Sequence, residues 1–84
     1  MQNVVQDINP VSAGVVLKVL IDAKEAAAMC GIGRSTWLRN VSAEKAPGPV
    51  TLGGRTLWRV QELLDWIAAG CPGRAKWEVM KGTL

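Results

Sequence analysis

Small apolar residues recur at helical spacing in the first half of the chain, and this pattern predicts a short helix. The members of the series are Ala23, Ala26, Ala27 and Cys30. A face made of such small side chains allows a second helix to cross closely. Asp22 stands just before the series and Glu25 follows three residues later, which is the spacing of a capping box. The helix is therefore expected to begin directly after Asp22.

A second helix is expected after a glycine turn. Gly31 lies where the chain must reverse, and Gly33 takes the N-cap position, where glycine is only slightly less favourable than serine. The helix is predicted over residues 34–41, with Trp37 and Val41 facing inward because they lie four residues apart. Polar side chains open it, as in helices that enter the major groove of DNA by their leading end. An ordinary helical hairpin with a chance glycine turn is the alternative interpretation.

Two groups of β-prone residues flank the helical pair. Residues 15–21 are rich in β-branched side chains and predict a short strand or an extended lead-in. Further along, residues 50–52 and 55–59 are separated by Gly53-Gly54. Glycine accepts the positive φ angles that a two-residue turn requires, so a hairpin is predicted with Arg55 at its tip. Such a hairpin is either a wing that touches DNA or a purely structural turn.

One further helix is predicted near the end of the chain. It is expected from about residue 60 to residue 69, and its inward face is expected to comprise Val60, Leu63, Leu64 and Ile67. Trp58 and Trp66 are expected to pack with it in the core. Residues 1–14 are predicted to be a flexible arm, and residues 71–84 a C-terminal tail. In this tail the segment around Trp77 forms either another helical turn or an apolar patch for a partner.

Length and composition agree with one small folded domain. The chain has 84 residues, of which 49% are hydrophobic and 20% are charged. A chain of this size forms a core, although a small one. No apolar run approaches the ~20 residues that span a bilayer, and the first residues lack the layout of a secretory signal. A cytoplasmic protein without a membrane partner is expected.

The residue types argue against catalysis and against a metal site. Histidine is absent, so the commonest general base and a frequent metal ligand are both missing. Cys30 and Cys71 match no zinc spacing and are too few for a disulfide framework. The acidic residues are scattered along the chain. We therefore expect no enzyme, no catalytic residue, no metal and no cofactor.

Positive charge is concentrated in the middle of the chain. The net charge is +3, but residues 23–60 alone hold six basic and two acidic side chains, a net of +4. The basic residues of this segment are Lys24, Arg34, Arg39, Lys45, Arg55 and Arg59. Clustering of this kind is typical of proteins that bind nucleic acid, although a run of charge can also be a solvated face.

Four segments together resemble a known family. They are residues 27–39, residues 47–55 (Pro-Gly-Pro-Val-Thr-Leu-Gly-Gly-Arg), residues 57–59 (Leu-Trp-Arg) and residues 62–67 (Glu-Leu-Leu-Asp-Trp-Ile). The chain resembles the AlpA-like regulators and phage excisionases of the MerR-like group over about residues 17–69. Gly33 stands where these proteins usually have serine, and Ala46 where they often have an aromatic residue. The resemblance implies a mainly α fold with a small β-hairpin wing, a winged helix-turn-helix domain over residues 15–70.

The resemblance also implies which residues contact DNA. In such proteins the second helix, here about residues 34–41, enters the major groove. The wing, here residues 50–59, touches the adjacent backbone or minor groove. The implied DNA-binding residues are Arg34, Ser35, Thr36, Arg39, Arg55 and Arg59. Arg34 and Thr36 are then candidates for base edges, and the other four for the backbone.

Two functions remain open from the sequence. The first is a small sequence-specific protein that binds double-stranded DNA and acts as a transcriptional regulator or as an excisionase, that is, a recombination directionality factor. Its candidate partners are further copies of itself on repeated sites, a site-specific recombinase and RNA polymerase. The second is a protein-interaction module on a winged-helix scaffold, which binds its partner through the C-terminal tail.

Overall fold

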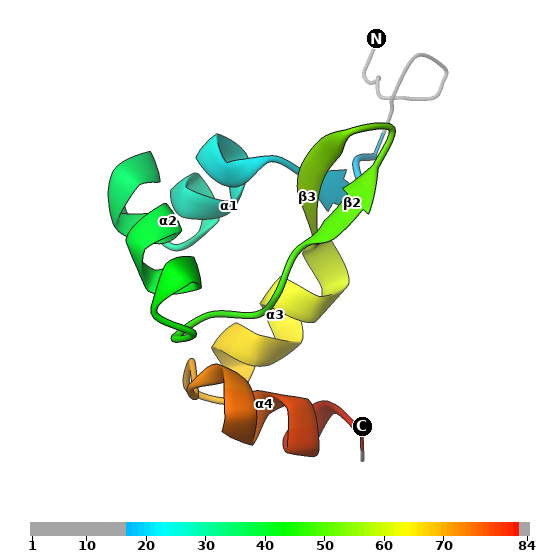
Figure 1. Ribbon diagram of the computed structural model, residues 1–84. Helices are drawn as coiled ribbons and strands as arrows, with labels where there is room; N and C mark the ends of the chain where they lie inside the picture. Colours follow the sequence, from blue (N-terminus) through cyan, green and yellow to red (C-terminus); the bar gives the residue numbers. More distant parts are fainter. Residues whose placement is uncertain (1–16, 83–84) are drawn as a thin grey trace, which may run out of the picture.

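The computed structural model describes residues 17–82, and in this part of the chain it contains four helices and a three-stranded antiparallel sheet (Figure 1). Their order is β1 (Leu20–Ile21), α1 (Ala23–Met29), α2 (Arg34–Ser42), β2 (Val50–Leu52), β3 (Arg55–Arg59), α3 (Val60–Ala68) and α4 (Arg74–Lys81). The predicted arm, residues 1–14, lies outside the described residues. None of the helices within residues 17–82 has the length and apolar character needed to cross a membrane.

α1 and α2 form as the local sequence predicts. The Asp22 carboxylate accepts a hydrogen bond from the Glu25 N–H at 2.9 Å, and the Glu25 carboxylate accepts one from the Asp22 N–H at 3.1 Å. These two bonds are the capping box expected from the spacing. Beyond α1, Gly31 adopts a φ of 71°, a conformation that glycine reaches without a Cβ clash. Gly33 then caps α2 without a side-chain hydrogen bond.

β3 is the central strand of the sheet and forms the predicted hairpin with β2. Val50 pairs with Leu57, and the hairpin closes through Gly53 and Gly54, whose φ angles are 58° and 78°. Positive φ at both positions is what a two-residue hairpin turn requires, so the turn follows from local chemistry. The hairpin prediction is confirmed.

The strand predicted over residues 15–21 is shorter in the structure. Only Leu20–Ile21 forms β1, which pairs with the last two residues of β3. β3 runs directly into α3, so the ladder ends where the Val60 N–H donates to the Val19 carbonyl at 2.9 Å. Leu17 and Val19 are exposed, and residues 15 and 16 lie outside the described residues.

Three tryptophans meet at the centre of the core. The ring of Trp37 makes edge-to-face contacts with Trp58 and Trp66, at centroid distances of 5.5 and 6.1 Å. The Trp58 indole N–H donates to the Pro47 carbonyl at 3.0 Å, and the Trp66 indole N–H to the Pro72 carbonyl at 2.8 Å. The Trp37 indole nitrogen is buried and has no hydrogen-bond partner among the described residues. The predicted core roles of Trp37, Trp58 and Trp66 are confirmed.

The inward face of α3 differs from the predicted one. Leu63 is fully buried and Trp66 is 5% exposed, whereas Leu64 and Ile67 are 49% and 37% exposed. Trp66 lies three residues after Leu63, and its large ring takes the inward position beside the other tryptophans. The helix is therefore rotated so that Leu64 and Ile67 turn toward solvent. Their prediction as inward residues was wrong.

α4 belongs to the same core, so the predicted boundary at residue 70 does not separate a tail from the domain. Trp77 is 1% exposed, and its indole N–H donates to the Glu62 carboxylate of α3 at 2.9 Å. The Arg74 guanidinium donates to the carbonyls of Ala46 and Val41, both at 3.0 Å, and so joins the start of α4 to the segment after α2. The Trp77 side chain is thus part of the core and is not exposed on the surface.

Glu62 is held as a carboxylate by the groups around it. Its side chain is 10% exposed and accepts hydrogen bonds from Lys81 and Trp77, both at 2.9 Å, and from Arg59 at 3.4 Å. Burial raises the pKa of Glu62, but the hydrogen bonds from Lys81 and Trp77 and the two positive charges outweigh it. The net effect lowers the pKa below its ordinary value of 4.5. Glu62 therefore favours the folded state most when it is ionised.

We expect the free energy of unfolding to fall as the pH drops below about 5. A carboxyl group with a lowered folded-state pKa contributes stability above its unfolded-state pKa. This contribution is lost as the pH falls through the folded-state value. Glu62→Gln should reduce stability at pH 7 by about 1–3 kcal/mol and flatten the remaining pH dependence. Urea titrations followed by circular dichroism between pH 7 and pH 3 measure both effects. An unchanged pH dependence in Glu62→Gln would contradict this role.

Candidate nucleic-acid interface

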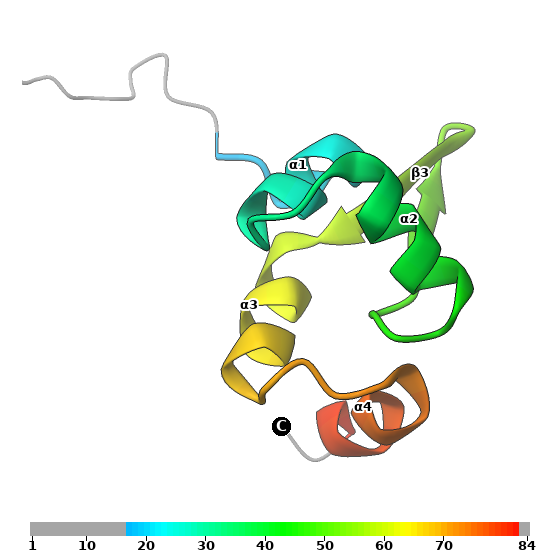
Figure 2. The same cartoon turned by 90° about the vertical axis from the view of Figure 1, so that its left-hand side faces the viewer.

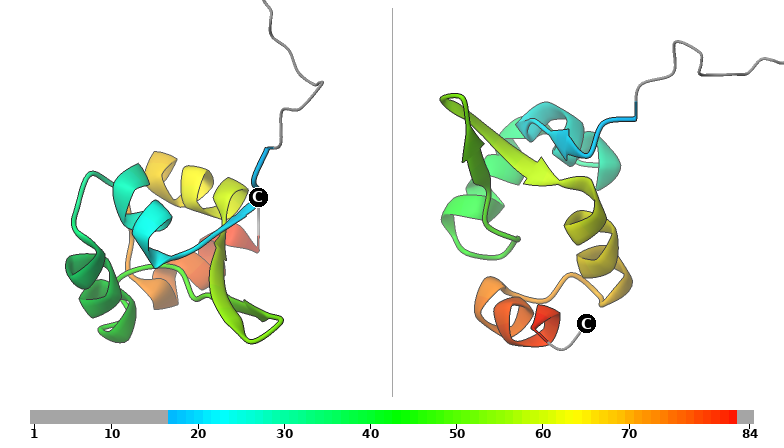
Figure 3. Two further views of the ribbon diagram at one scale, coloured as in Figure 1. Left: turned by 90° about the horizontal axis from the view of Figure 1, so that it is seen from above. Right: turned by 90° about the vertical axis from the view of Figure 1, so that its right-hand side faces the viewer.

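α2 and the β2–β3 hairpin lie on the same side of the molecule, with α3 on the opposite side (Figures 2 and 3). The short α1 packs against both α2 and β3 and so fixes their relative positions. Trp37 anchors the inner face of α2, which leaves Arg34, Ser35 and Arg39 exposed and Thr36 half-buried. The predicted residues of α2 therefore lie on its surface.

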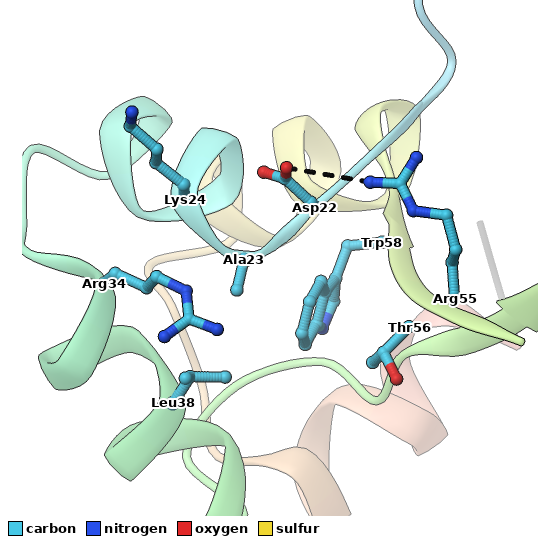
Figure 4. A pocket seen from close by; sticks show the side chains of 8 residues that line it. All are labelled: Asp22, Ala23, Lys24, Arg34, Leu38, Arg55, Thr56 and Trp58. Atoms are coloured by element: carbon cyan, nitrogen blue, oxygen red, sulfur yellow. Dashed lines mark ion pairs between the residues drawn. The ribbon is translucent and has the colours of Figure 1, made fainter.

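A hollow of about 450 Å³ separates the start of α2 from the hairpin (Figure 4). Arg34 points toward it from α2, and Arg55 lies across it on β3. The apolar side chains of Ala23, Leu38 and Trp58 line the space between them. The fold thus brings together two of the predicted DNA-binding arginines that lie 21 positions apart in the sequence.

Two charged residues that line the same hollow fall outside the predicted set of six. Lys24 stands at its edge with the amino group directed away from it, and Asp22 faces Arg55 (Figure 4). The distance from Asp22 Oδ2 to Arg55 Nη2 is 3.8 Å, and the two side chains are 40% and 68% exposed. No local signal links Asp22 to Arg55, because they meet only through the pairing of β1 with β3.

Positive charge without an acidic partner gathers on the α1–α2 side. Four basic side chains in α1, α2 and the loop after α2 form no ion pair with any of residues 17–82. They are Lys24, Arg34, Arg39 and Lys45. By contrast, Lys81 pairs with Glu62 and Glu78 at 2.9 and 3.1 Å. Arg74 is occupied by backbone carbonyls. Lys76 is the one described cation of α4 without such a bond. Most of the charge available to a polyanion therefore lies beside the hollow and along α2.

The exposed face of α2 carries hydrogen-bonding groups along its length. Ser35 and Arg39 lie four residues apart and so share one stripe of the helix. The Arg39 guanidinium donates to the Thr36 hydroxyl oxygen at 3.4 Å, which leaves the Thr36 O–H free to donate. Because α2 has no side-chain cap, no capping side chain occupies the backbone N–H groups of its first turn.

Arg59 is set apart from the other predicted residues. It pairs with Glu62 at 3.4 Å and lines a separate hollow between α3 and α4, together with Trp77 and Lys81. Its side chain is 56% exposed but turned toward the acidic group of α3. The structure thus does not bring Arg59 to the hollow that Arg34 and Arg55 share.

Within residues 17–82, no group of three or more cysteine or acidic side chains is arranged to hold a metal ion. Cys30 and Cys71 are free thiols. Burial, and secondarily the nearby Cys71, raises the pKa of Cys30 and so disfavours its thiolate.

Comparisons of the chain with family models, with curated proteins and with solved structures find no match. The functional interpretation therefore depends on the geometry and charge of the chain itself.

Proposed function

We propose that this protein is a small winged helix-turn-helix protein that binds double-stranded DNA. In this proposal α2 lies in the major groove, and the β2–β3 hairpin acts as the wing on the adjacent backbone or minor groove. The observation that carries the proposal is the position of the free positive charge. Lys24, Arg34 and Arg39 lack acidic partners among the described residues, and Lys24 and Arg34 line the same hollow as Arg55 of the hairpin.

The chemistry of the α2 surface supports distinct roles for its residues. Arg34 carries a planar guanidinium that can donate two parallel hydrogen bonds to a guanine edge, and Thr36 offers a hydroxyl beside it. Ser35, Arg39 and the N–H groups of the first turn can donate hydrogen bonds to phosphate oxygens. Arg55 suits a backbone phosphate beside the groove. Arg59 is left out of the proposed contacts because it is turned toward Glu62.

A protein of this kind acts by occupying DNA rather than by changing it chemically. We propose that it serves as a regulator of transcription or as the accessory factor that directs a site-specific recombinase toward excision. A single small domain offers limited contact area, so repeated sites that bind several copies fit its size.

Fluorescence anisotropy on labelled duplexes across a salt series tests the proposal. Each phosphate that a cationic side chain neutralises makes the slope of log affinity against log salt more negative by about 0.9, so the phosphate contacts of Arg39 and Arg55 predict a slope of about −2. Arg55→Ala should weaken all duplexes to a similar extent and reduce the slope by about one unit. Lys76→Ala on α4 removes a cation away from the interface and is the matched control. Absence of binding to any duplex at low salt would overturn the proposal.

A further inference from the structure

Asp22 places a fixed negative charge in the proposed DNA interface. It lines the same hollow as Arg34, Lys24 and Arg55, and it is the one acidic side chain among the described residues that line it (Figure 4). A carboxylate beside the path of a phosphate backbone repels it and would ordinarily weaken binding. The position of Asp22 therefore bears directly on how tightly the interface can hold DNA.

The carboxylate has little freedom to leave this position. One oxygen, Oδ1, accepts the Glu25 N–H at 2.9 Å and caps α1, while the Asp22 N–H is held by Glu25. The other oxygen, Oδ2, faces Arg55. The hydrogen bond from the Glu25 backbone lowers the pKa of Asp22, and this effect exceeds the opposing effect of burial. Asp22 is thus ionised at neutral pH and fixed by the same bonds that begin the helix.

The contact with Arg55 is loose enough to be exchanged. At 3.8 Å it is longer than the distances of about 2.7–2.9 Å that charge-assisted hydrogen bonds prefer. Both side chains are also in contact with solvent, where an ion pair contributes little. A phosphate oxygen can therefore take the place of the carboxylate at the guanidinium.

We propose that Asp22 competes with DNA phosphate for Arg55 and thereby limits the affinity of the interface. The inference rests on the proposed function and identifies the group that regulates the same site. In the free protein Arg55 is paired with Asp22. On binding, Arg55 turns to a phosphate, and Asp22 is left as an uncompensated charge near the backbone. Affinity is thus lower than the number of cations alone would produce.

Asp22→Asn tests the inference because asparagine is as good an N-cap as aspartate, so α1 keeps its start while the charge is lost. We expect the affinity for all duplexes at low salt to rise about two- to fivefold, with a steeper dependence on salt. Asp65→Asn on α3 makes the same change in net charge away from the hollow and should leave affinity nearly unchanged. In the Arg55→Ala background, Asp22→Asn should produce a clearly smaller increase, because Arg55 is no longer there to be released.

The outcomes separate this inference from the proposed function. The inference is supported if Asp22→Asn binds DNA more tightly than the native chain and if most of this increase is lost in the Arg55→Ala background. If the native chain binds duplexes but Asp22→Asn binds equally or more weakly, or if Asp65→Asn has the same effect, the inference is overturned while the proposed function stands. If the native chain binds no duplex, the proposed function fails and the inference fails with it. Circular dichroism of each variant verifies that α1 is retained.

Discussion

Trp77→Ala is expected to remove about half of the free energy of unfolding. Truncation of a buried tryptophan costs about 3–5 kcal/mol, and a domain of this size has a total of about 5–10 kcal/mol. The Trp77 side chain is 1% exposed, and its indole N–H is one of the donors to the partly buried Glu62 carboxylate. The substitution therefore opens a cavity and weakens the support of a charge at the same time.

Urea unfolding followed by far-ultraviolet circular dichroism measures this loss without depending on tryptophan fluorescence. Val79→Ala is the matched control, because Val79 lies on the same helix and is 73% exposed, and it should change stability by less than about 0.5 kcal/mol. Trp77→Phe keeps an aromatic ring but lacks the N–H donor. Its free energy of unfolding should lie between those of Trp77→Ala and Val79→Ala. An unchanged unfolding midpoint in Trp77→Ala would mean that α4 is not part of the cooperative unit.

Arg34→Ala is expected to weaken binding to the preferred duplex by about 1–3 kcal/mol and to relax the sequence preference. Arg34 points toward the hollow beside the hairpin and forms no ion pair within residues 17–82, so its guanidinium is available to a base edge. Arg34→Lys retains the charge but loses the two-pronged geometry. This variant should therefore keep most of its non-specific binding and lose the preference for one sequence.

The experiment first selects the preferred duplex from a random pool with the native chain. Anisotropy then compares this duplex with a scrambled one for each variant at a fixed salt concentration. Lys76→Ala on α4 controls for the loss of a positive charge. An equal loss of affinity for the selected and the scrambled duplex in Arg34→Ala would contradict base recognition by this residue and leave it a phosphate contact.

Local chemistry accounts for the elements that the sequence predicts well. The capping box at Asp22 and Glu25 requires only three residues of spacing, and the hairpin requires only two adjacent glycines with positive φ. Gly31 likewise ends α1 through its own backbone freedom. Such signals depend on neighbours in the chain, so they hold whatever the rest of the molecule does. The exposed positions of Arg34, Ser35 and Arg39 follow from the same periodicity once Trp37 faces inward.

Contacts between distant segments decided the inward face of α3 and the role of α4. Which face of α3 turns inward depended on Trp66 meeting Trp37, and the choice between a tail and a core helix depended on Trp77 reaching Glu62. Burial of a large ring is favourable only where other elements supply a matching surface, and periodicity along one helix carries no information about that surface.

By itself the sequence determined the order of the elements from β1 to α3, the two turns and the concentration of positive charge in residues 23–60. Tertiary structure alone decided how that charge is distributed between internal and free roles. It placed Arg55 opposite Arg34 and against Asp22, and outside that segment it bound Arg74 to backbone carbonyls. The physical reason is that the interaction between two charges weakens with the distance between them, and strand pairing and helix packing set that distance.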